Sequence, residues 1–202
     1  RAGGARYIDV FSFHVYNGIN GDIWLARWTM DGLMSVLHKY GVGDIEKWQT
    51  EQGYFAAVYG AYQPRLQGRW TMLQMMVFEQ YGIPKEHNHL WYDRSHGFWD
   101  FPTWWENDDG GLNPAAPLMR VFAEELYGTT FSRRLDFGKD GDKLYIGSLF
   151  ESPDKKKRVA AIMNVGCGRG RVELAVRGGA KLRVVSPFGV ESELAVERGR
   201  AV

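Results

Sequence analysis

One glutamate, Glu51, stands between a strand-like stretch and a glycine in the sequence KWQTEQGYFA, residues 47–56. Three aromatic residues lie close to it in the chain: Trp48, Tyr54 and Phe55. A carboxylate kept in a pocket there, and oriented by a neighbouring donor, can attack an acetal carbon as a nucleophile. A surface glutamate beside a turn would have the same local sequence, so the rest of the chain must decide between the two interpretations.

Two other strand-like stretches also carry polar and aromatic side chains near their ends. In parallel β/α architectures, functional groups gather where the strands lead into the following loops. Imidazoles, a phenol and an indole beside Glu51 would suit a glycoside, because an indole stacks on the apolar face of a sugar. Taken singly, each residue also has a structural explanation, such as a hydrogen-bonded core histidine. The side chains are Ser12, His14 and Tyr16 from residues 7–17, and His89, Trp91 and Asp93 from residues 87–93.

The elements that must position these groups follow from the hydrophobic pattern. Residues 7–17 are β-branched, aromatic and almost continuously apolar, which predicts a strand covered on both faces. A helix is predicted from Asp22 to about Tyr40, where basic residues and a glycine end it. The first 128 residues therefore predict consecutive βα units with a parallel sheet. The remaining predicted strands are 45–53 and 87–93, and the remaining helices are 65–81 and 113–128.

The pattern changes after residue 128. Six short strand-like stretches follow, separated by turns rich in Gly, Pro and Asp, and this pattern predicts an antiparallel β-sandwich over 129–202. The predicted fold class is therefore α/β, with one domain at 1–128 and a second at 129–202. Three βα units cannot close a barrel by themselves, so we expect the first domain to begin in mid-fold.

On these residues the sequence resembles the retaining glycoside hydrolases of clan A, which have a (β/α)8 TIM barrel and two catalytic glutamates. DVFSFHVYN resembles their strand six, where His14 and Tyr16 match a His-x-Tyr element. WQTEQGYFA resembles their strand seven, where Thr50, Glu51 and Gly53 match a Thr-Glu-x-Gly element. The resemblance implies the C-terminal part of the barrel plus an appended β-sandwich, with Glu51 as the catalytic nucleophile.

The resemblance also implies residues that bind the carbohydrate substrate, and neither a cofactor nor a metal. His14 and Tyr16 would orient Glu51 and contact substrate, and Trp91 would lie beneath the sugar in the −1 subsite. The loop 92–111 adds Asp93, His96 and Trp99 as further candidates. Packing of that loop's aromatic residues onto the barrel rim would explain them equally well.

One element of the family pattern is missing from residues 1–202. The acid/base glutamate of the family follows an asparagine at the end of strand four, and the chain contains no Asn-Glu dipeptide. Retaining hydrolysis needs two carboxyl groups about 5–5.5 Å apart. We therefore expect a segment or second chain to supply strands one to five with the acid/base residue, and residues 1–202 alone to be insoluble or molten.

The composition of the chain is balanced in charge, and two rival hypotheses about its function stay open. The chain has 25 Lys plus Arg against 24 Asp plus Glu, so no global charge indicates a nucleic acid or membrane partner. The first rival is a non-catalytic carbohydrate-binding protein with a degenerate barrel. The second is a metal-dependent hydrolase that uses His14, His89 and Asp93. The localisation stays open, although polysaccharide-degrading enzymes of this kind are often secreted or periplasmic.

Overall fold

The computed structural model forms two compact units, residues 1–116 and 117–202, which are described separately. The division falls within helix α4 (Ala115–Leu126), whereas the sequence pattern places the domain boundary near residue 128. No helix among the described residues is both long and apolar enough to span a membrane. The structure describes residues 4–16, 23–53, 57–58, 61–62, 64–83, 85–88, 112–138, 144–165, 170–176 and 181–201.

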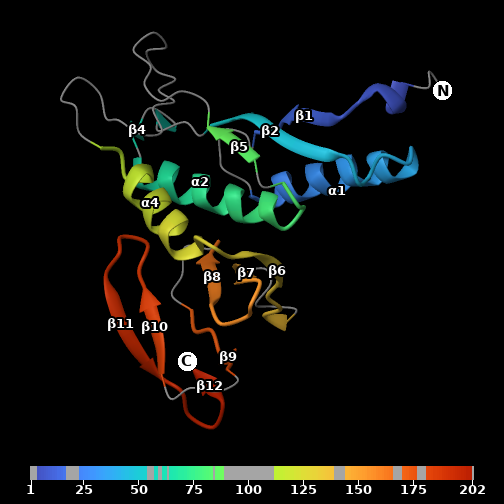
Figure 1. The fold of residues 1–202 in the computed structure, drawn as a ribbon. Coiled ribbons are helices and arrows are strands. Elements are labelled where there is room, and N and C mark those ends of the chain that lie inside the picture. Colours follow the sequence, from blue (N-terminus) through green and yellow to red (C-terminus); the bar gives the residue numbers. More distant parts are fainter. Residues whose placement is uncertain are drawn as a thin grey trace. The chain divides into compact units, whose positions relative to one another are not determined.

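A three-stranded parallel sheet forms the centre of the first unit. Its strands are β1 (Val10–His14), β2 (Glu46–Gln52) and β5 (Lys85–Asn88), in the order β1-β2-β5. Helix α1 (Ile23–Lys39) connects the first two strands, and helix α2 (Pro64–Glu79) lies between the second and third. The parallel pairing confirms the predicted consecutive βα units. Because such crossovers are right-handed and the strands advance in one direction, both helices cover the same face of the sheet (Figure 1).

Helix α1 packs through a stripe of apolar residues. Ile23, Ala26, Met30 and Leu37 are buried, and their spacing places them on one side of a helix. The helix ends with Lys39, whose positive charge suits a helix C-terminus, and Gly41 then adopts a positive φ of 73°. The predicted span from Asp22 to about Tyr40 is close to the observed one.

The first strand differs from its prediction in two ways. It begins at Val10 rather than residue 7. Val10 pairs with Glu46, the first residue of β2, so residues 7–9 lie beyond the start of β2 and pair with none of its residues. Residues Gly4–Tyr7 form a 3₁₀ helix, η1, and the apolar side chains of Tyr7 and Ile8 are exposed by 72% and 42%. The third strand begins at Lys85 rather than residue 87, and residues 89–93 lie outside the described part.

The two faces of β1 are unequally covered, contrary to the prediction. Phe13 faces α2, since its ring contacts Phe78 edge-on with centroids 6.2 Å apart. Alternation directs Ser12 and His14 to the opposite face, where both are exposed. We call this side, which α1 and α2 leave uncovered, the open face. A strand with hydroxyl and imidazole side chains on one face suits solvent or a polar site rather than an apolar core.

The second unit contains short antiparallel strands, as predicted for the region after residue 128. They form a three-stranded sheet and two separate pairs. Phe150 forms part of the core, with Phe122 and Phe131 packed edge-on against it. The strands are β6 (Thr130–Arg134), β7 (Tyr145–Glu151) and β8 (Arg158–Asn164) in the sheet, β10 (Lys181–Val185) with β11 (Glu191–Ala195), and β9 (Leu174–Ala175) with β12 (Arg200–Ala201).

Three short strands were absent from the sequence prediction. Strands β3 (Ala57–Val58) and β4 (Ala61–Tyr62) pair as an antiparallel hairpin in the first unit. Strand β12 in the second unit was also missed. Each of these strands has only two residues, which is too short for alternation of apolar and polar side chains to be recognised.

Candidate functional site

An extra residue in β2 directs Glu51 to the open face. Phe13 pairs with Gln49 while the next residue, His14, pairs with Glu51, so Thr50 has no counterpart in β1. The pairing with β5 shifts at the same place. In an unbroken strand Glu51 would share the face of Gln49, which is fully buried. This β-bulge instead places Glu51 beside His14, and bulges of this kind re-aim side chains at many functional sites.

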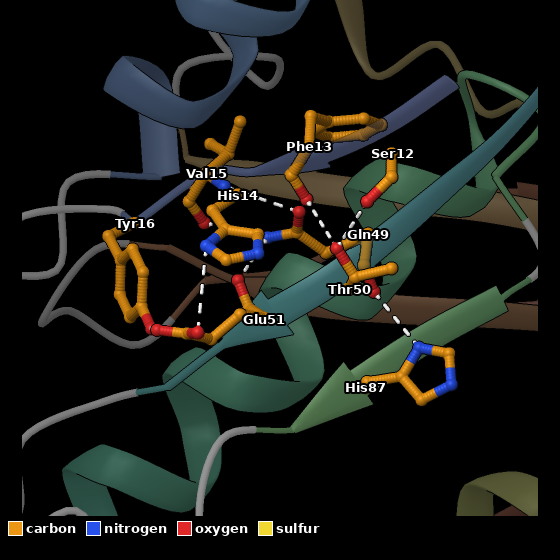
Figure 2. Close-up of polar contacts among 9 residues, drawn as sticks. All are labelled: Ser12, Phe13, His14, Val15, Tyr16, Gln49, Thr50, Glu51 and His87. Atoms are coloured by element: carbon orange, nitrogen blue, oxygen red, sulfur yellow. Dashed lines mark hydrogen bonds and ion pairs between the residues drawn. The ribbon is translucent and has the colours of Figure 1, made fainter. Parts of the chain in front are cut away.

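The carboxylate of Glu51 meets two side chains from the end of β1 (Figure 2). The hydroxyl of Tyr16 donates a hydrogen bond to Oε1 of Glu51. Nδ1 of His14 lies 3.6 Å from Oε2, which is ion-pair range when the imidazole is protonated. The side chains of His14 and Glu51 are 47% and 35% exposed, so ligands can reach them. The proximity expected of Tyr16 and Glu51 is confirmed, whereas their catalytic roles stay predictions.

The environment of Tyr16 keeps its phenol protonated. Burial raises the pKa of Tyr16 well above its ordinary value of 10, and the hydrogen bond to Glu51 and the negative charge of that carboxylate raise it further. The phenol is therefore a neutral hydrogen-bond donor at neutral pH. A donor of this kind stabilises the ionised form of the carboxylate that it contacts.

Two hydroxyl side chains, those of Ser12 and Thr50, lie just before His14 and Glu51 along their strands. The Oγ of Ser12 is 2.6 Å from Oγ1 of Thr50, so the two side chains lie on the same face of adjacent strands. Ser12 was a sequence candidate and Thr50 was part of the quoted motif. The pair adds a polar layer to the open face beside the carboxylate.

Sequence reasoning missed three polar residues that lie around these strand ends. Gln49 and Gln74 are buried and contact the backbone of Val15, and His87 places Nδ1 3.3 Å from the carbonyl oxygen of Gln49. A signal was present, since Gln49 and Gln74 occupy positions that the periodic patterns of β2 and α2 assign to the interior. Buried amides need hydrogen-bond partners, and that need marks them as candidates.

Five candidate residues lie outside the described part of the chain: His89, Trp91, Asp93, His96 and Trp99. Their sequence-based assignments as site or substrate-binding residues remain predictions. Among the described residues, no group of three or more His, Cys, Asp or Glu side chains is arranged to bind a metal ion.

Comparison with known proteins shows a similarity in fold. The chain matches no protein-family model and no curated protein sequence. Its fold is similar to the solved structure of a family 39 glycoside hydrolase from the gut symbiont Bacteroides cellulosilyticus WH2, with a TM-score of 0.71 and 16% sequence identity. The similarity covers 99% of this chain but 43% of that one, so this chain spans less than half the length of the solved structure. At this identity the likeness concerns the fold.

Proposed function

We propose that this chain is the C-terminal part of the catalytic (β/α)8 barrel of a retaining glycoside hydrolase, followed by a β-sandwich, and that Glu51 is the nucleophile. The observation that carries the proposal is the placement of the Glu51 carboxylate at the C-terminal end of the central strand, in contact with Tyr16 and His14. The likeness in fold to a glycoside hydrolase supports the reaction class.

The arrangement of the sheet fits part of a (β/α)8 barrel. One half of a doubly wound sheet can have the same strand order, so the likeness in fold to a glycoside hydrolase is what favours the barrel. Here the order β1-β2-β5 follows the chain and both helices lie on one face. A barrel has helices outside and side chains inside, and its active site lies where the strands end. We assign the open face to the barrel interior and Glu51 to the end where substrate enters.

The proposed reaction is a double displacement at the anomeric carbon. Glu51 attacks that carbon and forms a glycosyl ester while the bond to the leaving oxygen breaks. A second carboxylic acid protonates the leaving oxygen and then takes a proton from the water that cleaves the ester. We propose that this acid/base group belongs to the segment carrying barrel strands one to five. Tyr16, as a neutral donor, fixes the orientation of Glu51 for the attack.

Substitution of Glu51 tests the proposal in the complete enzyme. Glu51→Gln removes the nucleophile but keeps size and hydrogen-bonding capacity, so turnover of an aryl glycoside should fall about 10⁴-fold or more. Sugar binding and the unfolding temperature should change little. Glu46→Gln is the matched control, because Glu46 lies at the opposite end of the same strand.

Two outcomes would overturn the proposal. Turnover by Glu51→Gln at the rate of the unaltered enzyme would exclude Glu51 as the nucleophile. Sugar binding without turnover in the unaltered protein would favour a non-catalytic carbohydrate-binding protein instead.

A further inference from the structure

The side-chain amide of Gln49 links the ends of β1 and β2. Its Oε1 accepts a hydrogen bond from the backbone N–H of Val15 at 3.2 Å, and its Nε2 donates to the carbonyl oxygen of Val15 at 3.0 Å. The same Nε2 donates to the backbone carbonyl of Glu51, also at 3.0 Å. One buried group therefore contacts the backbone of both strand ends (Figure 2).

The side-chain amide of Gln49 continues the hydrogen bonding between β1 and β2 beyond their last paired residues. The pairing of β1 with β2 ends at His14 and Glu51, directly after the bulge. A carboxamide has the same donor and acceptor groups as a peptide unit, so Gln49 continues the pairing by one residue. A polar side chain buried at this point would be costly without such partners.

A second glutamine extends the link to helix α2. Nε2 of Gln74 donates to the carbonyl oxygen of Val15 at 2.8 Å. That oxygen therefore accepts two donors, which its two lone pairs allow. Val15 lies between His14 and Tyr16, the two residues that contact the Glu51 carboxylate. The helix and both strand ends thus converge on one backbone position.

We infer that Gln49 is a positioning residue for Glu51, with Gln74 as its support from α2. The inference rests on the proposed function, because it assigns to Gln49 the distance between the nucleophile and the donors on β1. Gln49 does not contact substrate in this account; it acts by fixing the backbone of Glu51 and of Val15. Displacement of a reacting group by about 1 Å can reduce turnover on the order of 100-fold.

A double-mutant cycle with chemical rescue tests this role in the complete enzyme. Glu51→Gly leaves a gap that azide can enter as an external nucleophile. The azide ion attacks the anomeric carbon of an aryl glycoside and displaces the phenolate. The product is a glycosyl azide of opposite anomeric configuration. Gln49→Met, which keeps side-chain length but removes the amide, should lower kcat about 10- to 100-fold when Glu51 is present. In the azide-rescued Glu51→Gly background the same change should have an effect of less than about 2-fold, because no carboxylate remains to be positioned.

The controls separate positioning from general loss of structure. Gln80→Met removes another buried glutamine, which accepts a hydrogen bond from Arg27 at 2.8 Å, and should leave kcat unchanged. Gln74→Met should lower kcat less than Gln49→Met, since it removes one of several contacts. If Gln49→Met does not fold, Gln49→Asn makes the same comparison with a shorter side chain, which stays neutral and polar but moves the amide away from the strand ends.

The outcomes for the inference and for the proposed function differ. An equal loss of rate in both backgrounds, or an unchanged kcat in Gln49→Met, would overturn the positioning role while leaving the nucleophile in place. Failure of azide to restore turnover in Glu51→Gly would instead refute Glu51 as the nucleophile, and the positioning role with it.

Discussion

At the scale of single residues, the contact between Tyr16 and Glu51 is central to the proposed mechanism. The phenol donates to one carboxylate oxygen, and its raised pKa keeps it protonated. Such a donor fixes the orientation in which the carboxylate attacks the anomeric carbon, and that orientation is needed in the transition state but not for substrate binding. The contact should therefore affect the transition state more than the binding of substrate.

Tyr16→Phe tests this contact because it removes only the hydroxyl. We expect kcat to fall about 10- to 100-fold, with a change in the substrate Kd of less than about 3-fold, since the interaction concerns the reacting carboxylate. Steady-state kinetics and direct binding measurements check the two quantities separately. Tyr81→Phe is a matched control, because Tyr81 also donates to a carboxylate, that of Asp31 at 2.6 Å. A weaker substrate affinity with unchanged kcat would contradict the assigned role.

At the scale of elements, the sequence was informative wherever periodicity was long and regular. The apolar stripe of α1 and the runs around Phe13 and Trp48 predicted the order of strands and helices. The bulge at Thr50 could not be predicted, since alternation alone places Glu51 with buried Gln49. The resemblance to a family motif, rather than periodicity, identified Glu51 as a site residue. The link through Gln49 was missed because its partners are backbone groups that are distant in sequence.

A second acidic residue of the first unit, Glu86, has a buried carboxyl group. Glu86 on β5 accepts a hydrogen bond from Nε2 of Gln52 at 2.8 Å. The residue is only half-buried as a whole, but its carboxyl group is enclosed, and this burial raises its pKa well above the ordinary range. The nearby charge of Glu79 raises it further, against the opposing effect of the Gln52 hydrogen bond.

This raised pKa predicts a dependence of stability on pH. Below about pH 4 the carboxyl is protonated in both the folded and unfolded states. As the pH rises, the unfolded chain ionises first, so the stabilising contribution of Glu86 is lost as the pH rises through its folded-state pKa. Glu86→Gln should remove this loss and raise the unfolding temperature of the complete enzyme at pH 7 by about 2–4 °C, which corresponds to about 1 kcal/mol in a large domain.

Unfolding measured between pH 4 and pH 8 checks the Glu86 prediction. Glu46→Gln serves as the control of opposite sign, because the hydrogen bond from Lys85 lowers the pKa of Glu46. A Glu86→Gln variant with the same pH dependence as the unaltered protein would show that this carboxyl is not buried in solution.

At the scale of the whole molecule, the open face is the main feature to be explained. Among the described residues β1 pairs only with β2, and Ser12 and His14 are exposed on the face opposite the helices. The exposed positions are mostly polar within β1, whereas the exposed apolar residues Tyr7 and Ile8 precede it. We propose that barrel strands one to five cover this face and the free edge of β1.

Expression of residues 1–202 with and without that segment tests the whole-molecule proposal. Alone, the chain should be insoluble, or should bind a dye specific for exposed apolar surface and melt without a sharp transition. Together with the segment that carries the first five strands, it should melt cooperatively. A soluble, monomeric chain of 202 residues with a cooperative melt would show that the sheet needs no such partner.

Covalent trapping of the glycosyl-enzyme intermediate would identify the nucleophile. The complete enzyme would be treated with activated 2-deoxy-2-fluoro glycosides, whose fluorine slows hydrolysis of the glycosyl ester so that it accumulates. We expect a mass increase of one fluoro-sugar per protein, located by peptide fragmentation on Glu51. A label on a different carboxylate, or turnover that inverts the anomeric configuration without forming an adduct, would contradict this expectation.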